Sequence, residues 1–394
     1  MKHSILIATL APLLVAASCS SGSSTGGATS TSTPTPSSTG SGTGLSFAIT
    51  ERGSFAEPWA EAFLPGTRLL FITEKAGTMK FVDTANGRLG TVTGIPTVDY
   101  GGQGGFGDVA FLPGEEAKGT TGRTIYLSWV EAGSGGTRGA VVGRGTLDCL
   151  EADACSISAL SVIWRQTPKV TGSGHYSHRI AFSPDAQYLF VTSGERQKQT
   201  PAQDTTNTLG TVVRLNLDGS AAAGNPLEAQ GSPSDQIWSW GHRNLLGIDF
   251  DASGQLWEVE HGPAGGDELN LVKKGQNYGW PVRSNGDNYD GSDIPDHTAD
   301  DGFAKPAISW TPVIAPGNMT FYSGNLFPGL KGDLLIAGLS SEAIIRVEVN
   351  GETAREVARY DMGKRIRSVI EGPDGGLWVL EDGAGGRLLE LRPN

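Results

Sequence analysis

The chain has 394 residues, a formal net charge of −12 and 57 glycines. This acidic balance argues against nucleic acid or an anionic lipid surface as a partner. Beyond the N-terminal segment no apolar run is long enough for a transmembrane helix, so we expect no membrane-spanning helix there. Residues 45–394 suffice for one large domain or two ordinary ones.

The first residues, MKHSILIATLAPLLVAASC, have the features of a bacterial export signal. Lys2 supplies the positive start, and the apolar stretch that follows is too short to span a bilayer. The small residues before Cys19 are typical of a lipoprotein processing site, although Ala16 replaces the usual leucine. We therefore expect a lipoprotein signal peptide over residues 1–18; an ordinary cleaved signal is the alternative.

Residues 19–44 are rich in Ser, Thr, Gly and Pro and contain no large apolar side chain. Such a composition cannot bury enough surface to fold, so we expect a flexible tether. A lipid on Cys19 would then be the only membrane attachment. The expected location is the cell envelope, on the periplasmic or cell-surface side.

Short runs of β-forming residues, separated by turn residues, fill the remaining chain and predict an all-β fold. One unit recurs six times: an apolar pair, a turn, and a second strand that ends near Glu, Gly or Asp. The copies start 48, 71, 67, 73 and 48 residues apart, at Ala62, Ala110, Ala181, Ile248, Phe321 and Val369. Since a four-stranded blade needs about 40–50 residues, residues 45–394 are predicted to form a six-bladed β-propeller of four-stranded antiparallel blades.

The segment DCLEADAC carries Cys149 and Cys155. An exported protein sits in an oxidising compartment, so a small local disulfide is expected. A zinc site is the alternative, but the segment offers no second pair of ligands.

A propeller brings loops from every blade to a central channel, so candidate site residues should lie near the ends of the repeat strands. In GGQGGFGDVAF, glycines around Gln103 let the backbone approach a ligand closely; a plain turn is the alternative. GHYSHRIAF holds His175 and His178, which an extended chain would point to opposite faces. One of them as a general base is therefore favoured over a two-histidine metal site, and a structural role is the remaining alternative.

Further polar residues lie near the repeat strands, and the first of them, Glu195, ends the same third repeat that follows the two histidines. Glu195 in SGER could contact a substrate hydroxyl, or be a surface or salt-bridge residue. Arg243, followed by Asn244 in WSWGHRN, offers a planar fork suited to a carboxylate or a quinone-like oxygen. The alternative is that Arg243 stacks on Trp238 or Trp240.

The segment EVEHGPAGGDELN, residues 258–270, combines backbone carbonyls with carboxylates and has no soft ligands. Oxygen-only ligands suit a hard cation such as calcium. In KRIRSVIEGPDG, Arg365 and Arg367 stand two apart at a strand start, so they should face one side and bind a multiply anionic ligand. Solvated surface arginines are the alternative.

Together, GQGGFGDV, GHYSHRIAF, GHRNLLGIDF, EHGPAGGDELN, KGQNYGWP and KRIRSVIEGPDG resemble one family. This is the family of soluble pyrroloquinoline-quinone (PQQ)-dependent sugar dehydrogenases, with the bacterial aldose sugar dehydrogenases as the nearest branch. The similarity extends from about Pro58 to the final ELRPN. It implies a six-bladed propeller and PQQ- and calcium-dependent oxidation of an aldose to the lactone.

The resemblance also implies roles for individual residues. His175 would be the general base, and Glu195 and Arg243 complete the catalytic candidates. Calcium at the quinone would be held by the carbonyls of Gly262 and Pro263, and a second, structural calcium by Glu268 and the Tyr278 backbone. The residues implied in cofactor binding are Gln103, Arg243, Asn244, Tyr289, Gly338, Leu339, Ser340, Arg365 and Arg367.

Two departures from the family pattern stand out. Ser340 replaces a usual lysine, which removes one cation from the cofactor site. His178 stands where close relatives tend to have a small residue, adding bulk or a second titrating group.

The implied partners are an aldose and an external electron acceptor, with a homodimer possible. A calcium-dependent propeller hydrolase of the lactonase type and a non-catalytic binding propeller are the alternatives.

Overall fold

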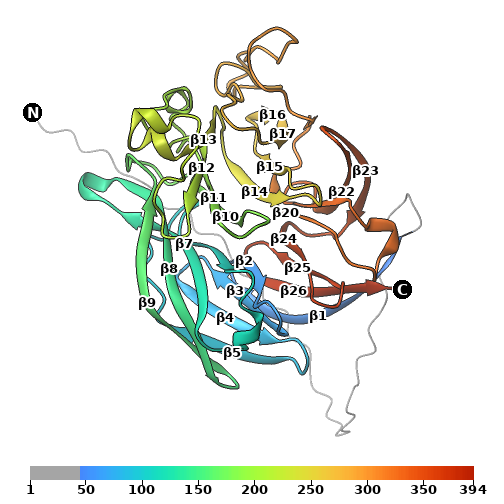
Figure 1. Cartoon of the computed structure of the whole chain (residues 1–394). Helices are drawn as coiled ribbons and strands as arrows, with labels where there is room; N and C mark the ends of the chain where they lie inside the picture. The colour runs from blue at the N-terminus through green and yellow to red at the C-terminus, as the bar shows by residue number, and fades with distance from the viewer. Residues whose placement is uncertain (1–44) are drawn as a thin grey trace, which may run out of the picture. The chain divides into compact units, whose positions relative to one another are not determined.

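The computed structural model describes residues 45–394, which form 26 β-strands and six short 3-10 turns without an α-helix (Figure 1). The predicted all-β fold is therefore confirmed. No helix in this described part is long and apolar enough to cross a membrane. The predicted signal peptide (residues 1–18) and the predicted tether (residues 19–44), which includes Cys19, lie outside the described residues.

Four of the sheets contain four antiparallel strands each. The first is β10 (Ser177–Phe182), β11 (Tyr188–Ser193), β12 (Thr211–Asn216) and β13 (Ile237–Trp240). The second is β14 (Leu245–Phe250), β15 (Leu256–Glu260), β17 (Asp267–Leu271) and β19 (Ile308–Trp310). The third is β20 (Pro316–Phe321), β21 (Leu334–Gly338), β22 (Ala343–Asn350) and β23 (Thr353–Asp361), and the fourth is β24 (Ile366–Glu371), β25 (Leu377–Glu381), β26 (Ala384–Pro393) and β1 (Phe47–Ala56).

A fifth sheet has eight strands and consists of two antiparallel runs of four. One run is β2 (Pro58–Phe63), β3 (Leu69–Glu74), β4 (Thr78–Asp83) and β5 (Arg88–Thr93); the other is β6 (Phe106–Phe111), β7 (Arg123–Ala132), β8 (Arg138–Glu151) and β9 (Ala154–Arg165). A short parallel pairing of β5 with β9 joins the runs. A two-stranded ribbon of β16 (Ala264–Gly265) and β18 (Gly286–Asp287) completes the strands. The 3-10 turns are η1 (Glu116–Lys118), η2 (Ser134–Gly136), η3 (Thr200–Gln203), η4 (Glu228–Gln230), η5 (Ser234–Gln236) and η6 (Pro328–Leu330).

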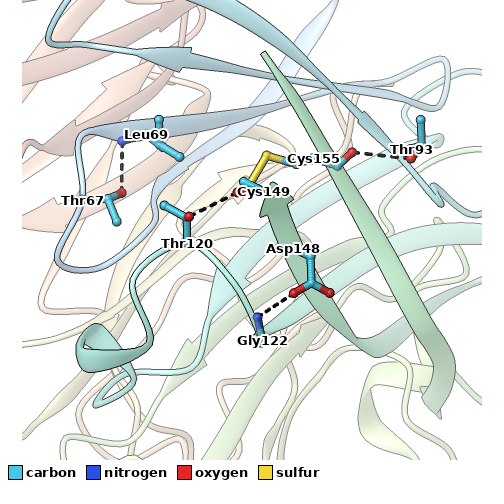
Figure 2. Close-up of a disulfide and its surroundings, with 8 residues drawn as sticks. All are labelled: Thr67, Leu69, Thr93, Thr120, Gly122, Asp148, Cys149 and Cys155. Carbon is cyan, nitrogen blue, oxygen red and sulfur yellow. Dashed lines mark hydrogen bonds between the residues drawn. A yellow bond between two sulfur atoms is a disulfide. The ribbon is translucent and has the colours of Figure 1, made fainter. Parts of the chain in front are cut away.

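A disulfide joins Cys149 and Cys155 at the tip of the β8–β9 hairpin, as the sequence predicted (Figure 2). Cys155 is also the residue of β9 that pairs with Val92 of β5. Hydrogen bonds from Thr120 and Thr93 reach the two cysteine carbonyls. The bridge therefore fixes the hairpin where it pairs with the neighbouring run.

The first strands of the six groups of four contact one another in a closed cycle: β2, β6, β10, β14, β20, β24 and again β2. The chain ends close this ring, because β1 pairs with β26 from Phe47 opposite Pro393 onward. Each repeat copy found in the sequence is the hairpin between the first two strands of one group. The repeated motif therefore surrounds the common centre.

The apolar core lies between adjacent groups. In one example, Trp257 of β15 is fully buried in a cluster that includes Ile336 of β21 and Ile345 of β22. Burying an isoleucine side chain such as either of these stabilises the fold by about 1.5–3 kcal/mol. This packing holds the first strands in place, and with them the loops that carry the polar residues described next.

Candidate active site

All six groups contribute residues to one pocket of about 270 Å³. Five of the residues implied by the sequence line it: Gln103, Asn244, Leu339, Arg365 and Arg367. The sequence did not single out Glu57, Trp59, Lys75 or Asp382, which line it as well. His261 also lines the pocket.

The segment GHYSHR does not run as a regular strand. His175, Ser177 and His178 have φ angles of 50°, 58° and 63°, in the left-handed region that side chains rarely adopt. A register shift between Ser177 and Ile180 accompanies them. Strained residues of this kind gather at functional sites. The two histidine rings have different partners, since Nδ1 of His175 faces Glu195 and Nδ1 of His178 faces Ser128.

His175 and Glu195 form a buried pair, with 2.5 Å between His175 Nδ1 and Glu195 Oε1. Burial lowers the pKa of His175 below its ordinary value, against the opposing effect of Glu195, so the imidazole is neutral at neutral pH. Burial acts to raise the pKa of Glu195, but hydrogen bonds from His175 and from backbone N–H groups outweigh it and leave it lowered. An ionised Glu195 therefore holds the proton of His175 on Nδ1, which leaves Nε2 free to accept another.

Glu195 is only 1 % exposed. Its carboxylate also accepts hydrogen bonds from the backbone N–H groups of Gln197, Lys198 and Gln199. It is therefore placed to orient His175 rather than to touch a substrate hydroxyl. Gln103 supports the same histidine, because its Oε1 accepts a 2.7 Å hydrogen bond from the His175 N–H. The adjacent Gly102 has φ +57°, and a Cβ there would lie 2.5 Å from the Ser173 hydroxyl, so glycine is needed for this approach.

Arg243 lies beside the pocket and donates hydrogen bonds to the His261 carbonyl at 3.1 Å and the Tyr289 hydroxyl at 3.3 Å. Its guanidinium lies 5.1 Å from the Trp280 ring centre and 5.8 Å from that of Tyr289. The alternative of stacking on Trp238 or Trp240 is therefore wrong; these aromatic partners come from a later loop.

Asn244 lies inside the pocket lining, and its Oδ1 accepts a 3.2 Å hydrogen bond from Ser177. Tyr289, in contrast, is 78 % exposed and does not line the pocket. Of the turn 338–340, Leu339 lines the pocket, while the Ser340 hydroxyl donates to the Val313 carbonyl and is exposed.

Gly262 and Pro263 are buried, and neither carbonyl accepts a hydrogen bond from a described residue. Asp267 fixes the backbone here by accepting a hydrogen bond from the Gly262 N–H at 2.8 Å. Free carbonyl oxygens beside carboxylates fit a hard cation such as calcium. Glu268 and Tyr278 line a small pocket of about 10 Å³ together with Gly262, and the Tyr278 carbonyl also accepts no hydrogen bond in the described part.

The sequence did not anticipate a buried polar cluster around His242. Nδ1 of His242 lies 3.5 Å from Oε1 of Glu258 and 3.5 Å from Oε1 of Glu260, and all three residues are buried. They lie close enough together to share a cation. The carboxylates raise the pKa of His242 to about 9, against the opposing effect of burial. A histidinium therefore compensates the buried acids.

Arg365 and Arg367 lie side by side, as predicted, but both bind Asp382. Arg367 donates to Oδ1 at 2.9 and 2.6 Å, and Arg365 donates to Oδ2 at 3.0 Å. The side chain of Arg365 is 49 % exposed and that of Arg367 only 13 %. Asp382 neutralises one of the two charges and orients both guanidinium groups beside the pocket.

The described residues thus form a ring of six strand groups around one polar pocket. Two arginines line this pocket, and a histidine hydrogen-bonded to a buried carboxylate lies beside it. A sequence model of the Glucose / Sorbosone dehydrogenase family matches residues 55–390, and the chain belongs to this family. It is 36% identical over 341 residues to the aldose sugar dehydrogenase YliI of Escherichia coli strain K12, covering 85% of this chain and 90% of that protein.

Solved structures agree with this assignment. The soluble aldose sugar dehydrogenase of Escherichia coli in the apo form superposes with a TM-score of 0.81 at 34% identity, covering 89% of this chain and 100% of that one. The PQQ-bound aldose sugar dehydrogenase of Streptomyces coelicolor superposes with a TM-score of 0.71 at 26% identity, covering 89% and 99% of the two chains.

Proposed function

We propose that the protein oxidises an aldose at its anomeric carbon to the lactone, using PQQ and calcium, with His175 as general base. The observation that carries this proposal is the pairing of neutral His175 with ionised Glu195 beside a pocket that holds two arginines. Family membership supports a sugar substrate, and the PQQ-bound relative supports the cofactor.

The chain offers the groups that such a cofactor needs. PQQ carries three carboxylates, which Arg365 and Arg367 would bind, while Gln103, Asn244 and Leu339 would line its site. The carbonyls of Gly262 and Pro263 would hold the calcium. Bound PQQ with calcium would supply the acceptor for the hydride that leaves the anomeric carbon.

The chain's own residues would handle the proton. Nε2 of His175 would take it from the anomeric hydroxyl, since Nδ1 keeps its own proton against Glu195. Glu195 would stabilise the resulting imidazolium, and Arg243, fixed by the His261 carbonyl and Tyr289, would contact the cofactor or substrate. Glu268 and the Tyr278 carbonyl would hold a second, structural calcium.

We also propose that the six strand groups are the blades of a six-bladed propeller, since each contains one repeat copy and four strands.

Cys19 would carry the lipid that attaches the protein to the cell envelope. An external quinone, cytochrome or dye would accept the electrons, and two subunits could associate.

The test is to reconstitute the purified apoprotein with calcium and PQQ and to follow dye reduction with several aldoses. Turnover that requires both calcium and PQQ is expected. His175→Ala should abolish turnover while PQQ binding is retained. Absence of PQQ binding would overturn the proposal, and binding without sugar turnover would point to another alcohol substrate. Hydrolysis of lactones without PQQ would favour the calcium-dependent hydrolase instead.

A further inference from the structure

His178 and Trp59 form part of the pocket wall, and the proposed mechanism uses neither. The His178 ring stacks on the Trp59 indole, with centroids 5.0 Å apart and planes 8° from parallel. The Arg179 guanidinium also lies 4.0 Å from the centre of the Trp59 ring. Both His178 and Trp59 line the pocket although each side chain is almost fully buried. The ring of His178 is therefore held in one position.

A chain of hydrogen bonds determines where the proton of His178 resides. The backbone N–H of Asp108 donates to Ser128 Oγ at 2.7 Å, and Ser128 Oγ lies 2.7 Å from His178 Nδ1. The fully buried Ser128 hydroxyl has no other acceptor among the described residues. Since a buried hydroxyl needs an acceptor, it must donate to Nδ1. The proton of the neutral imidazole is then on Nε2.

Gly107 fixes which edge of the ring faces inward. A Cβ at this glycine would lie 1.9 Å from Cε1 and 2.2 Å from Nδ1 of His178. The Nδ1–Cε1 edge therefore packs against β6, in space that only glycine leaves open. Nε2 makes no hydrogen bond to a described residue, and it is not fully shielded from solvent. Because His178 lines the pocket, Nε2 is accessible from it.

The imidazole also stays neutral. Burial lowers the pKa of His178 to about 3, and the positive charges of Arg179 and Arg196 act in the same direction. His178 is therefore not a second titrating group near neutral pH, contrary to one of the two effects considered from the sequence. Its Nε2–H group is therefore a hydrogen-bond donor throughout the neutral pH range.

We propose that His178 Nε2–H donates a hydrogen bond to an acceptor oxygen of the quinone cofactor, which makes His178 a cofactor-binding residue. This inference rests on the proposed function. A carbonyl or carboxylate oxygen of PQQ is the matching chemistry, because Ser128 holds the ring proton on Nε2 and an N–H group needs an acceptor. Ser128 and Gly107 act through His178 as positioning residues.

The first test reads the tautomer directly in the purified protein labelled with ¹⁵N-histidine. The expected NMR spectrum shows His178 protonated on Nε2 alone, with a change at Nε2 when calcium and PQQ are added. Ser128→Ala should produce a mixture of tautomers. A proton on Nδ1, or no change at Nε2 when PQQ is bound, would overturn the proposal.

The second test compares PQQ affinity in variants whose folding is checked by thermal unfolding. His178→Phe keeps an aromatic ring on Trp59 but removes the donor, and should weaken PQQ binding about three- to tenfold. His178→Gln keeps a donor and should lose less. If wild type and the Phe variant bind PQQ with equal affinity, the role of His178 is overturned but the proposed function is not. If the wild-type protein binds no PQQ, both are overturned.

Discussion

Asp382 accepts two hydrogen bonds from the Arg367 guanidinium, at 2.9 and 2.6 Å, and this pair is largely shielded from solvent. Arg365 binds the other oxygen of the same carboxylate from a much more exposed position. The two arginines that look equivalent in KRIR therefore differ in what they do for the folded protein.

Replacing each arginine by alanine should separate these roles. Arg367→Ala leaves a shielded carboxylate without its main partner, so the free energy of unfolding should fall by about 2–4 kcal/mol. Arg365→Ala should change it by less than about 0.5 kcal/mol, because exposed ion pairs contribute little. Urea unfolding measures both, and Arg355→Ala, which removes a surface arginine paired with Glu348, controls for the change in charge. Equal destabilisation by the two pocket variants would contradict the structure.

The pairing of His175 with Glu195 predicts the pH dependence of turnover. Burial lowers the pKa of His175, so the rate should fall on acidification only below about pH 6.5, where the base becomes protonated. Glu195 opposes that lowering, so Glu195→Gln should move the acid limb to still lower pH. It should also reduce kcat by about 10²-fold or more, because the base loses its orientation. The pH profile of kcat measures both effects, and an unshifted acid limb would show that Glu195 does not act on His175.

The buried cluster at His242 predicts a large stability effect without loss of a cofactor contact. His242→Gln leaves Glu258 and Glu260 buried without a cation, and should reduce the free energy of unfolding by about 3–5 kcal/mol. The double variant His242→Gln/Glu258→Gln should recover part of this loss, because one uncompensated charge is gone. Chemical denaturation of the single and double variants provides the measurement. A double variant less stable than His242→Gln would show that the carboxylate is not the source of the cost.

The disulfide should matter for stability alone. Cys149 and Cys155 lie six positions apart in the chain, so their bridge closes a very short loop. Replacing both by serine should lower the free energy of unfolding by about 2 kcal/mol. PQQ affinity should not change, since neither residue lines the pocket. Urea unfolding and a PQQ titration under the same conditions check the two halves of this expectation.

The positions of the strands could be predicted because their signals are local. Alternating apolar residues and Pro-Gly turns identify hairpins, and each repeat copy coincides with the first two strands of a group. Four pocket residues share a position in the repeat that the sequence analysis did not use. Each directly follows the last residue of a second strand: Lys75, His261, Leu339 and Asp382. The repeat therefore contained a usable signal, because in four of its six copies the residue after the second strand lines the pocket.

Other parts of the site could not be predicted from spacing. The three-residue interval between His175 and His178 suggests opposite faces only if the chain is extended, and the left-handed residues make that assumption invalid. The role of Glu195 depends on backbone N–H groups that a tight turn directs at its carboxylate. The tautomer of His178 depends on Ser128, which is 50 residues away in the chain.

The pairing of β1 with β26 has a consequence for how the molecule is assembled. The first and the last strands of the described residues pair with each other, so the ring cannot close until β26 has been made. Until then β1 and β25 each lack a neighbour, and unpaired strand edges are prone to associate with other chains. Deletion of β26 should therefore leave a fold that is open at one seam, and the yield of soluble protein should fall although no residue of the pocket has been removed.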